Sequence, residues 1–237
     1  STPLDLESAN FLCKICDVLK IASGDNNYFK LIENVLKSHK PVILSTGMSN
    51  INDLKKTIQF ITQIKNKSFL TDKFSILHCI ASYPTELKDS NIITIKHLKK
   101  LFGLQVGLSD HCRSNLPALV SLGMGVRIFE KHITLSNNYS NFIDHKVALN
   151  PKDFANYVKQ IKEAYETIGK KRNNIFYSEK KTFLNNRRSI YAAKFISYGE
   201  IINQKNTKTL RPFKKKSTDI NNRNFFAKKN YKVNDII

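Results

Sequence analysis

Two histidines stand where they could share a metal ion. His111 and His132 each end a short apolar run, and the two runs are consecutive along the chain. On neighbouring parallel strands, the two imidazoles would lie side by side and leave coordination positions open for substrate and water. Glu130 and His132 are two residues apart, so on a strand they share one face while Lys131 points to the other. This pattern predicts metal-assisted chemistry, with two purely structural histidines as the alternative.

Five apolar runs would position these groups. They begin about 22 to 33 residues apart, which is the spacing of successive βα units. Each run is continuously apolar, as expected for a buried parallel strand. The runs cover residues 18–23, 41–46, 74–79, 105–111 and 127–132. Each run contains or ends in a different reactive group; these groups are Ser23, Ser45, His78, residues 109–111, and Glu130 with His132.

Reactive groups at the ends of several strands are typical of a closed α/β barrel, whose active site is built from the carboxyl ends of its strands. An open dinucleotide-binding sheet is expected to carry G-x-G-x-x-G after its first strand, and the sequence lacks that motif. We therefore predict an α/β fold with a (β/α) barrel of TIM type over residues 1–169.

Helical patterns lie between and after the runs. Apolar residues recur at helical spacing over residues 51–64, after the polar Asn50. Asn150 and Pro151 start a second helix, which Gly169 ends. The apolar face of this second helix is predicted to consist of Phe154, Val158, Ile161, Tyr165 and Ile168.

The chain changes in character after residue 169. Residues 170–186 are polar and charged, and we predict a linker there. Residues 187–237 contain short β-like pieces, 189–193 and 200–202, which are separated by turns. We expect this last segment to form a second, small, mostly β domain.

Composition excludes several classes of protein. A hydrophobic fraction of 41%, with 15 Phe and 9 Tyr, argues against a disordered chain. No apolar run reaches the roughly 20 residues that a membrane span needs. The first residues lack the anatomy of a secretory leader, so we expect a cytoplasmic protein whose start is missing. Cys13 and Cys16 form a C-x-x-C pair, for which redox chemistry or half a zinc site is the alternative. We expect reduced thiols one helical turn apart.

The net charge of +20 raises the question of nucleic-acid binding. The basic residues are scattered, however, and residues 214–216 form the one run of three lysines. Aromatic residues at stacking distance do not alternate with them. We predict a solvated basic surface that attracts anionic substrates, and no nucleic-acid or membrane partner.

The reactive strand ends belong to short motifs that occur in a fixed order. They are KIASGD at residues 20–25, LSTGM at 44–48, LHC at 77–79, SYP at 82–84, VGLSDH at 106–111 and EKH at 130–132. DHK at 144–146, RRSIY at 187–191 and LRP at 210–212 follow. Together they resemble the N-acetylneuraminate (sialic acid) synthase family, which includes the legionaminic and pseudaminic acid synthases. The resemblance covers most of the chain.

The resemblance implies an eight-stranded (β/α) barrel followed by a small antifreeze-like (SAF) domain. It implies a domain-swapped homodimer, in which each small domain caps the partner's barrel. The implied reaction condenses phosphoenolpyruvate with an N-acetylmannosamine-like sugar aldehyde and water, giving a nonulosonic (sialic-type) acid and phosphate. The implied cofactor is a divalent metal, Mn²⁺ or else Mg²⁺ or Co²⁺.

The resemblance also assigns roles to positions of this sequence. His111 and His132 match the metal ligands, and Arg211 matches an arginine that reaches the partner's active site. His78 is expected to be buried without binding a ligand. The positions matching the phosphoenolpyruvate site are Thr2, Lys20, Ser23, Ser45 and Ser109. The positions expected at the sugar are Tyr83 and Asp144, and the predicted catalytic carboxylates are Asp25, Glu130 and Asp144.

The chain departs from the family pattern in several places. The resemblance starts at the end of the family's third strand, so we expect the first two strands to be absent and these 237 residues alone to be inactive. The absent strands would carry a catalytic glutamate and a lysine–glutamine pair. Asp25 stands where the family usually has Glu, and the match to the antifreeze-like domain is weak after about residue 213.

Three other interpretations stay open on the sequence. A truncated remnant of such a synthase would fold or assemble without turnover. A basic nucleic-acid-binding protein would show an affinity that falls steeply with salt. An ordinary barrel aldolase would form a Schiff base through Lys20 or Lys131. The number and order of the motifs favour the synthase.

Overall fold

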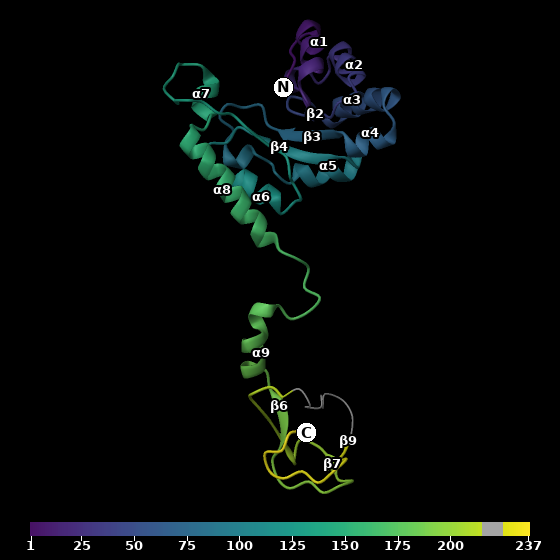
Figure 1. The fold of residues 1–237 in the computed structure, drawn as a ribbon, viewed down its shortest axis with the longest axis vertical. Coiled ribbons are helices and arrows are strands. Elements are labelled where there is room, and N and C mark those ends of the chain that lie inside the picture. Colours follow the sequence, from purple (N-terminus) through teal and green to yellow (C-terminus); the bar gives the residue numbers. More distant parts are fainter. Residues whose placement is uncertain (215–224) are drawn as a thin grey trace. The chain divides into compact units, whose positions relative to one another are not determined.

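The structure is a computed structural model that describes residues 1–214 and 225–237. Two of the three lysines at 214–216 therefore lie outside the described residues. The chain divides into two compact units, Ser1–Gly169 and Lys170–Ile237 (Figure 1). Within the described residues, no helix is both long and apolar enough to cross a membrane.

A five-stranded parallel sheet forms the centre of the first unit. Each strand pairs with the next one along the chain, so the strands lie in sequence order. Every predicted apolar run contains one of these strands, which confirms the parallel α/β class. The strands are β1 (Leu19–Ile21), β2 (Val42–Ser45), β3 (Phe74–Cys79), β4 (Gln105–Asp110) and β5 (Phe129–Lys131).

The register of the sheet separates an apolar face from a reactive face. Ile21 pairs with Leu44 and Leu44 pairs with Ile76, so one row of fully buried aliphatic side chains crosses the sheet toward the helices. Alternate residues of a strand point to opposite faces, so the intervening positions form the second face. That face carries one reactive side chain from each strand; these are Lys20, Ser45, Cys79, Ser109 and Glu130.

Helices connect the strands and pack on the apolar face (Figure 1). The Asn50 side chain accepts hydrogen bonds from the Asn52 and Asp53 amides, and Asn150 accepts one from Asp153, which confirms both predicted helix starts. The helices are α1 (Leu6–Ile15), α2 (Phe29–Lys37), α3 (Ile51–Ile64), α4 (Lys67–Asp72), α5 (Thr94–Phe102), α6 (Leu116–Leu122), α7 (Ile143–Val147) and α8 (Pro151–Ile168), with 3-10 turns η1 (Ser23–Asp25) and η2 (Leu87–Asp89).

The predicted apolar face of α8 is only partly right. Val158 and Ile161 pack against the core, but Tyr165 and Ile168 are about half exposed. The fully buried residue of α8 is Tyr157, which the spacing did not select. The reason is that α8 has 18 residues and packs on α6, which has 7, so its last turns extend past their partner.

The second unit contains two small antiparallel sheets. β6 (Ser189–Ala192) pairs with β8 (Thr207–Leu210), and β7 (Ile201–Ile202) pairs with β9 (Phe225–Phe226). Both predicted strand segments of this region therefore contain a strand. A small core holds the sheets together; it consists of Ala192, Ile196, Ile202, Ala227 and Ile237.

The segment predicted as a linker is not structureless. Residues 170–186 contain η3 (Tyr177–Glu179) and α9 (Lys180–Asn186). Arg172 forms an ion pair with Glu179, and the Phe183 ring packs 4.7 Å from that of Phe213. The polar composition of the segment hid these contacts, because only a few apolar side chains are needed to anchor one short helix.

Gly107 in β4 leaves no room for a side chain. A Cβ at this position would lie 2.5 Å from Leu77 Cδ2 and 2.7 Å from the Ile128 carbonyl oxygen. We expect Gly107→Ala to lower the free energy of unfolding by about 1–3 kcal/mol, the usual cost of overpacking. Gly123→Ala is the matched control, because its Cβ would lie 3.5 Å from the nearest atom. Chemical denaturation compares the two, and equal stability of both variants would refute the steric argument.

Candidate active site

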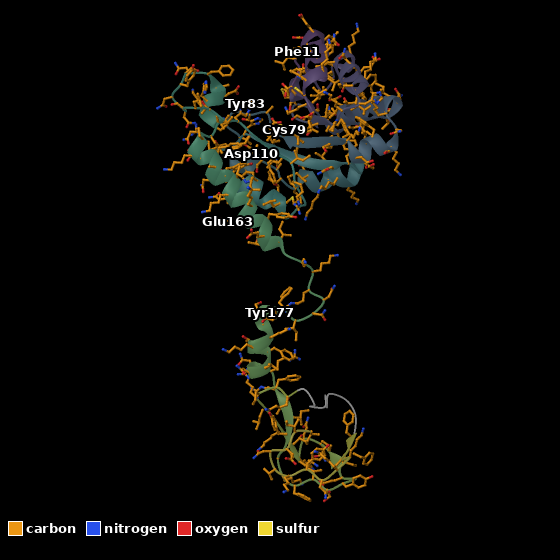
Figure 2. All side chains as sticks on the ribbon, in the orientation of Figure 1. Phe11, Cys79, Tyr83, Asp110, Glu163 and Tyr177 are labelled. Carbon is orange, nitrogen blue, oxygen red and sulfur yellow. The ribbon has the colours of Figure 1, made fainter. Side chains whose placement is uncertain are left out.

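The two predicted metal-binding histidines lie next to each other. His111 directly follows β4 and His132 directly follows β5, and their ring centres are 5.1 Å apart. The Tyr83 ring packs 4.3 Å from that of His111 and 5.8 Å from that of His132 (Figure 2). Asp144 of α7 places a carboxylate oxygen 4.0 Å from His132 Nδ1. Four predicted site residues from separate parts of the chain therefore surround one point at the carboxyl edge of the sheet.

The ring of His111 is fixed in one orientation. It is buried, and its Nδ1 lies 2.8 Å from the Ile80 carbonyl oxygen. A carbonyl can only accept a hydrogen bond, so Nδ1 carries the proton of the neutral ring and Nε2 keeps a free electron pair. The His111 backbone carbonyl accepts a further hydrogen bond from the Thr85 amide at 3.1 Å. Such a ring is prepared to bind a metal through Nε2.

The surroundings shift the two histidines in opposite directions. Burial disfavours the charged form of His111, but hydrogen bonds with Cys79 and the Ile80 carbonyl outweigh burial and raise its pKa. Burial lowers the pKa of His132, and the neighbouring His111 lowers it further. Simultaneous protonation of His111 and His132 is therefore disfavoured.

A charged network lies beside the histidines on the same face. Lys20 Nζ is 3.3 Å from Glu130 Oε2, and both side chains are partly exposed. Ser109 Oγ donates to Glu130 Oε1 at 3.1 Å. The network joins β1 to β4 and β5, and it offers both a fixed positive charge and a carboxylate to a bound substrate.

Two further predicted residues, Ser23 and Ser45, lie in direct contact. Ser23 Oγ donates to Ser45 Oγ at 2.8 Å and accepts from the Gly47 amide at 3.2 Å. A Cβ on Gly47 would lie 2.7 Å from Ser23 Oγ. The glycine therefore allows the backbone after β2 to approach the hydroxyl pair closely, which is typical of sites that bind an anion through hydroxyl and amide donors.

Cys79 is the site residue that the sequence reasoning missed. Its thiol lies 3.5 Å from Ser23 Oγ and 4.0 Å from His111 Nδ1, so it links the hydroxyl pair to the histidines. Burial raises the pKa of this thiol, but hydrogen bonds with His111, Ser23 and Ser45 outweigh burial and bring the pKa to about 7. The sequence did contain a signal for Cys79, namely strand parity, by which alternate residues of a strand point to the same face. Cys79 pairs with Ser109 and so shares its face.

Three predicted residues are not drawn into this cluster. Asp25 ends η1, and in the described part of the chain its carboxylate makes no hydrogen bond or ion pair. Thr2 is half-buried next to Ser1, whose carbonyl accepts from the Lys20 amide, so it lies beside β1. Arg211 is exposed in the second unit. The roles of all three stay predictions.

His78 and Lys131 both point away from the reactive face, as expected from strand parity. His78 is buried, and its Nε2 lies 2.8 Å from the Ser90 carbonyl oxygen. Lys131 forms a fully buried ion pair with Asp110 at 2.9 Å. Burial of the Lys131 ammonium away from the histidines leaves it out of reach of a carbonyl substrate there.

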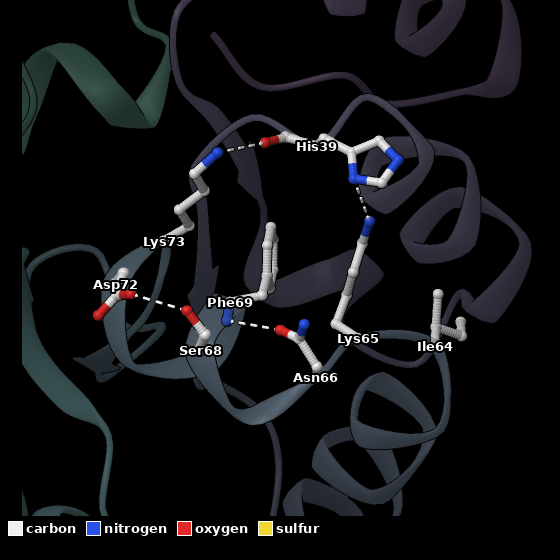
Figure 3. A pocket seen from close by; sticks show the side chains of 8 residues that line it. All are labelled: His39, Ile64, Lys65, Asn66, Ser68, Phe69, Asp72 and Lys73. Carbon is white, nitrogen blue, oxygen red and sulfur yellow. Dashed lines mark hydrogen bonds between the residues drawn. The ribbon is translucent and has the colours of Figure 1, made fainter.

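A hollow of about 420 Å³ lies elsewhere, at the opposite end of the strands (Figure 3). It is open and basic: Lys65 Nζ lies 3.1 Å from His39 Nδ1, and Lys73 Nζ donates to the His39 carbonyl oxygen at 3.2 Å. These lysines sit where α3 and α4 end, and cations are favoured at helix C-termini. This structural role explains the charge, and the amino-terminal edge of such sheets is not where barrel enzymes react.

The histidine pair fits the metal that the resemblance implies. No cluster of three or more His, Cys, Asp or Glu side chains in metal-binding geometry occurs among the described residues. The chain would therefore offer two imidazole nitrogens, and oxygen atoms of water or substrate would complete the coordination. The fixed Nδ1–H of His111 is the feature that supports this fit.

Comparison with known proteins decides the family. Residues 1–173 match the family model of NeuB. The chain belongs to the NeuB family. It is 37% identical, over 90% of its length, to the uncharacterized protein MJ1065 of Methanocaldococcus jannaschii, and 32% identical, over 100%, to the N,N′-diacetyllegionaminic acid synthase of Campylobacter jejuni. It spans 61% of the first relative and 71% of the second.

Solved structures agree with this NeuB assignment. The N-acetylneuraminic acid (sialic acid) synthetase of Leptospira borgpetersenii, in complex with citrate, matches 76% of this chain and 61% of its own, with 29% identity and a TM-score of 0.68. A protein described as spore coat polysaccharide biosynthesis protein E, from Chromobacterium violaceum, matches 99% of this chain and 70% of its own, with a TM-score of 0.81. At 23% identity the latter shows a shared fold. The resemblance to sialic acid synthases is thereby confirmed.

The buried His78 predicts how stability depends on pH. Burial lowers its pKa, so the unfolded chain takes up a proton before the folded one as the pH falls below about 6.5. The contribution of His78 to the free energy of unfolding is therefore expected to be full above that pH and to decrease below it. His78→Gln, which keeps a donor for the Ser90 carbonyl, should weaken this decrease between about pH 6.5 and 5.

Urea denaturation at several pH values measures the effect. Part of the decrease should persist in His78→Gln, because the pKa of His132 is also lowered. His97→Gln, at an exposed position on α5, is the matched control and should follow the wild-type curve. A pH dependence in His78→Gln as steep as that of the wild type would contradict the assignment.

Proposed function

We propose that this NeuB-family chain belongs to a nonulosonic acid synthase that condenses phosphoenolpyruvate with an N-acetylmannosamine-like sugar aldehyde and water and releases phosphate. One observation carries the proposal: the His111–His132 pair lies beside the Lys20–Glu130–Ser109 network on one face of a NeuB-type sheet. The names of the Campylobacter and Leptospira relatives describe this type of synthase.

The anionic substrate would bind at the β1 and β2 end of the site. Lys20 supplies a positive charge, and Ser23, Ser45 and Ser109 supply hydroxyl donors for the phosphate and carboxylate oxygens of phosphoenolpyruvate. Thr2, beside β1, would add a further polar contact. The chain's net charge of +20 helps to attract such a substrate.

The sugar would bind at the other end of the site. Tyr83 and Asp144 flank the histidines, so they would orient sugar hydroxyls next to the reacting aldehyde. His111 and His132 would hold Mn²⁺, Mg²⁺ or Co²⁺, which supplies Lewis acidity toward that aldehyde when bound. Glu130 contacts Lys20 and Ser109 and precedes His132 by two residues, so it would be the carboxylate that accepts or returns a proton. Asp25 would contribute a second carboxylate from η1.

The other interpretations lose support. Lys131 is buried against Asp110, and Lys20 is paired with Glu130, so neither lysine is presented as a free Schiff-base nucleophile. The relatives give no support to an inactive remnant. Some lysines of the described chain, such as Lys73 and Lys99, donate hydrogen bonds to backbone carbonyls of the chain itself, which weakens the nucleic-acid interpretation.

Phosphate release tests the proposal directly. The protein is mixed with phosphoenolpyruvate, N-acetylmannosamine and Mn²⁺, with EDTA and sugar-free reactions as controls. Release should require both the sugar and the metal. His111→Ala and His132→Ala should each lower kcat by at least about 100-fold, because each removes one of the two proposed protein ligands.

His97→Ala is the matched histidine control and should retain full activity, because His97 is exposed on α5. A version extended at its amino terminus by the two strands of a family barrel is assayed in parallel. A folded, extended protein that binds Mn²⁺ but releases no phosphate with any mannosamine-type sugar would refute the synthase.

We infer further that the second unit is the family's antifreeze-like domain and that the protein acts as a domain-swapped homodimer. The Chromobacterium structure, which matches 99% of this chain, supports a common fold for this unit as well. In such a dimer the exposed Arg211 would reach the partner's active site and bind an anionic group there.

Mixing two inactive variants tests this arrangement. Arg211→Ala and His111→Ala should each be inactive alone in the phosphate-release assay. After unfolding and refolding together, mixed dimers should recover about a quarter of wild-type activity, because half of the dimers are mixed and each has one intact site. No recovery, with mixed dimers present by mass spectrometry, would show that Arg211 acts in its own subunit or not at all.

A further inference from the structure

The proposed reaction leaves one buried charge pair without a role. Asp110 and Lys131 end β4 and β5 and form an ion pair of 2.9 Å, with side chains that are 2% and 1% exposed. Both lie on the face of the sheet opposite to the histidines. Burying two charges is costly unless further hydrogen bonds satisfy them, so the partners of this pair show what it holds in place.

The pair binds both backbone polar groups of Cys112, the residue that follows His111. Asp110 Oδ1 accepts from the Cys112 amide at 2.9 Å, which closes a tight turn over His111. Lys131 Nζ donates to Asp110 Oδ2 and also to the Cys112 carbonyl oxygen. The ammonium on β5 therefore fastens the turn that contains His111 to the end of the neighbouring strand.

The same pair sets the relation between the two histidines. Asp110 and Lys131 stand directly opposite each other in the β4–β5 register. His111 and His132 each follow one member of the pair, so their side chains project to the opposite face from matching positions. A shift of one strand end against the other would change the separation of 5.1 Å between the imidazole rings.

The environment of the pair argues against a role for it in binding solvent or substrate. The Tyr157 ring of α8 covers it, with its centre 5.8 Å from Lys131 Nζ. Tyr157 itself is 2% exposed. A helix of the outer layer therefore seals the pair off from solvent, and the sheet itself lies between the pair and the histidines.

We propose that Asp110 and Lys131 are positioning residues that fix the geometry of the metal-binding histidine pair from the back of the sheet. This inference rests on the proposed function in that His111 and His132 bind the metal. The positioning of the rings is nevertheless a property of the chain alone and can be measured without metal.

The test compares four variants of the 237-residue chain with the wild type. Lys131→Met removes the charge and all its hydrogen bonds, and Asp110→Asn keeps an acceptor for the Cys112 amide but removes the charge. Lys131→Arg restores a buried cation. Lys159→Met is the matched control, because Lys159 pairs with Glu163 on the exposed side of α8.

Binding of Mn²⁺ is followed by the electron paramagnetic resonance of the free ion. Lys131→Met should weaken Mn²⁺ binding on the order of 10- to 100-fold, the range for removing a group that orients a metal ligand. Asp110→Asn should weaken it less, Lys131→Arg should regain most of the affinity, and Lys159→Met should bind like the wild type. Folded Lys131→Met or Asp110→Asn protein with wild-type affinity would overturn the inference.

Imidazole nitrogen NMR on the metal-free protein gives the independent measurement. The wild type should show His111 protonated at Nδ1, and Lys131→Met or, if that variant does not fold, Asp110→Asn should show a mixture of tautomers. An unchanged His111 signal in both would also overturn the inference. If the wild type shows the fixed tautomer but binds no Mn²⁺, the proposed function fails, while the positioning by Asp110 and Lys131 is still decided by the NMR comparison.

Discussion

Strict alternation of side chains across a parallel sheet is the constraint on which this structure depends. Neighbouring strands pair in register from β1 to β5, so a single parity assigns every strand position to one of two faces. Aliphatic residues such as Leu44 and Ile76 take the face that packs on the helices. The reactive residues take the other face and meet at the edge where all five strands end. A slip of one residue would exchange the two faces, so the fold and the site are specified together.

The two faces carry different kinds of electrostatic interaction. The Lys20–Glu130 pair is partly exposed, so water screens it and an arriving anion can compete for the lysine. The Asp110–Lys131 pair is buried, so breaking it would leave an uncompensated charge in a medium of low dielectric constant. A lysine that can leave its carboxylate for a substrate anion, as Lys20 can, suits a binding surface. An ion pair that stays closed, as Asp110–Lys131 does, suits the support of neighbouring backbone. Strand parity places each kind of pair where its chemistry is useful.

Strand parity and helix capping are what the sequence could predict. The apolar runs located all five strands, Asn50 and Asn150 marked two helix starts, and the parity of Glu130, Lys131 and His132 was right. Contacts between side chains from distant strands could not be read in this way. Alternation puts Cys79 on the reactive face, but its contacts with Ser23 and His111 depend on how separate strand ends meet. The burial of Tyr157 rather than Tyr165 depends on the length of α6, which spacing within α8 does not contain.

Small residues on the reactive face explain how a well-packed sheet can hold a substrate at all. Between Lys20 and Glu130, the carboxyl edge of this face carries the small residues Ser45, Cys79 and Ser109, whereas the opposite face is rich in Leu, Ile and Phe. Near Gly47 and Gly107 even a methyl group would clash, with Ser23 and Leu77 respectively, so the remaining space is set by the backbone itself. Side chains this short make few dispersion contacts and contribute little to stability. The large aliphatic side chains on the other face must therefore supply most of the packing that stabilises the sheet. The buried Asp110–Lys131 pair fixes the ends of β4 and β5 relative to each other, which short side chains cannot do.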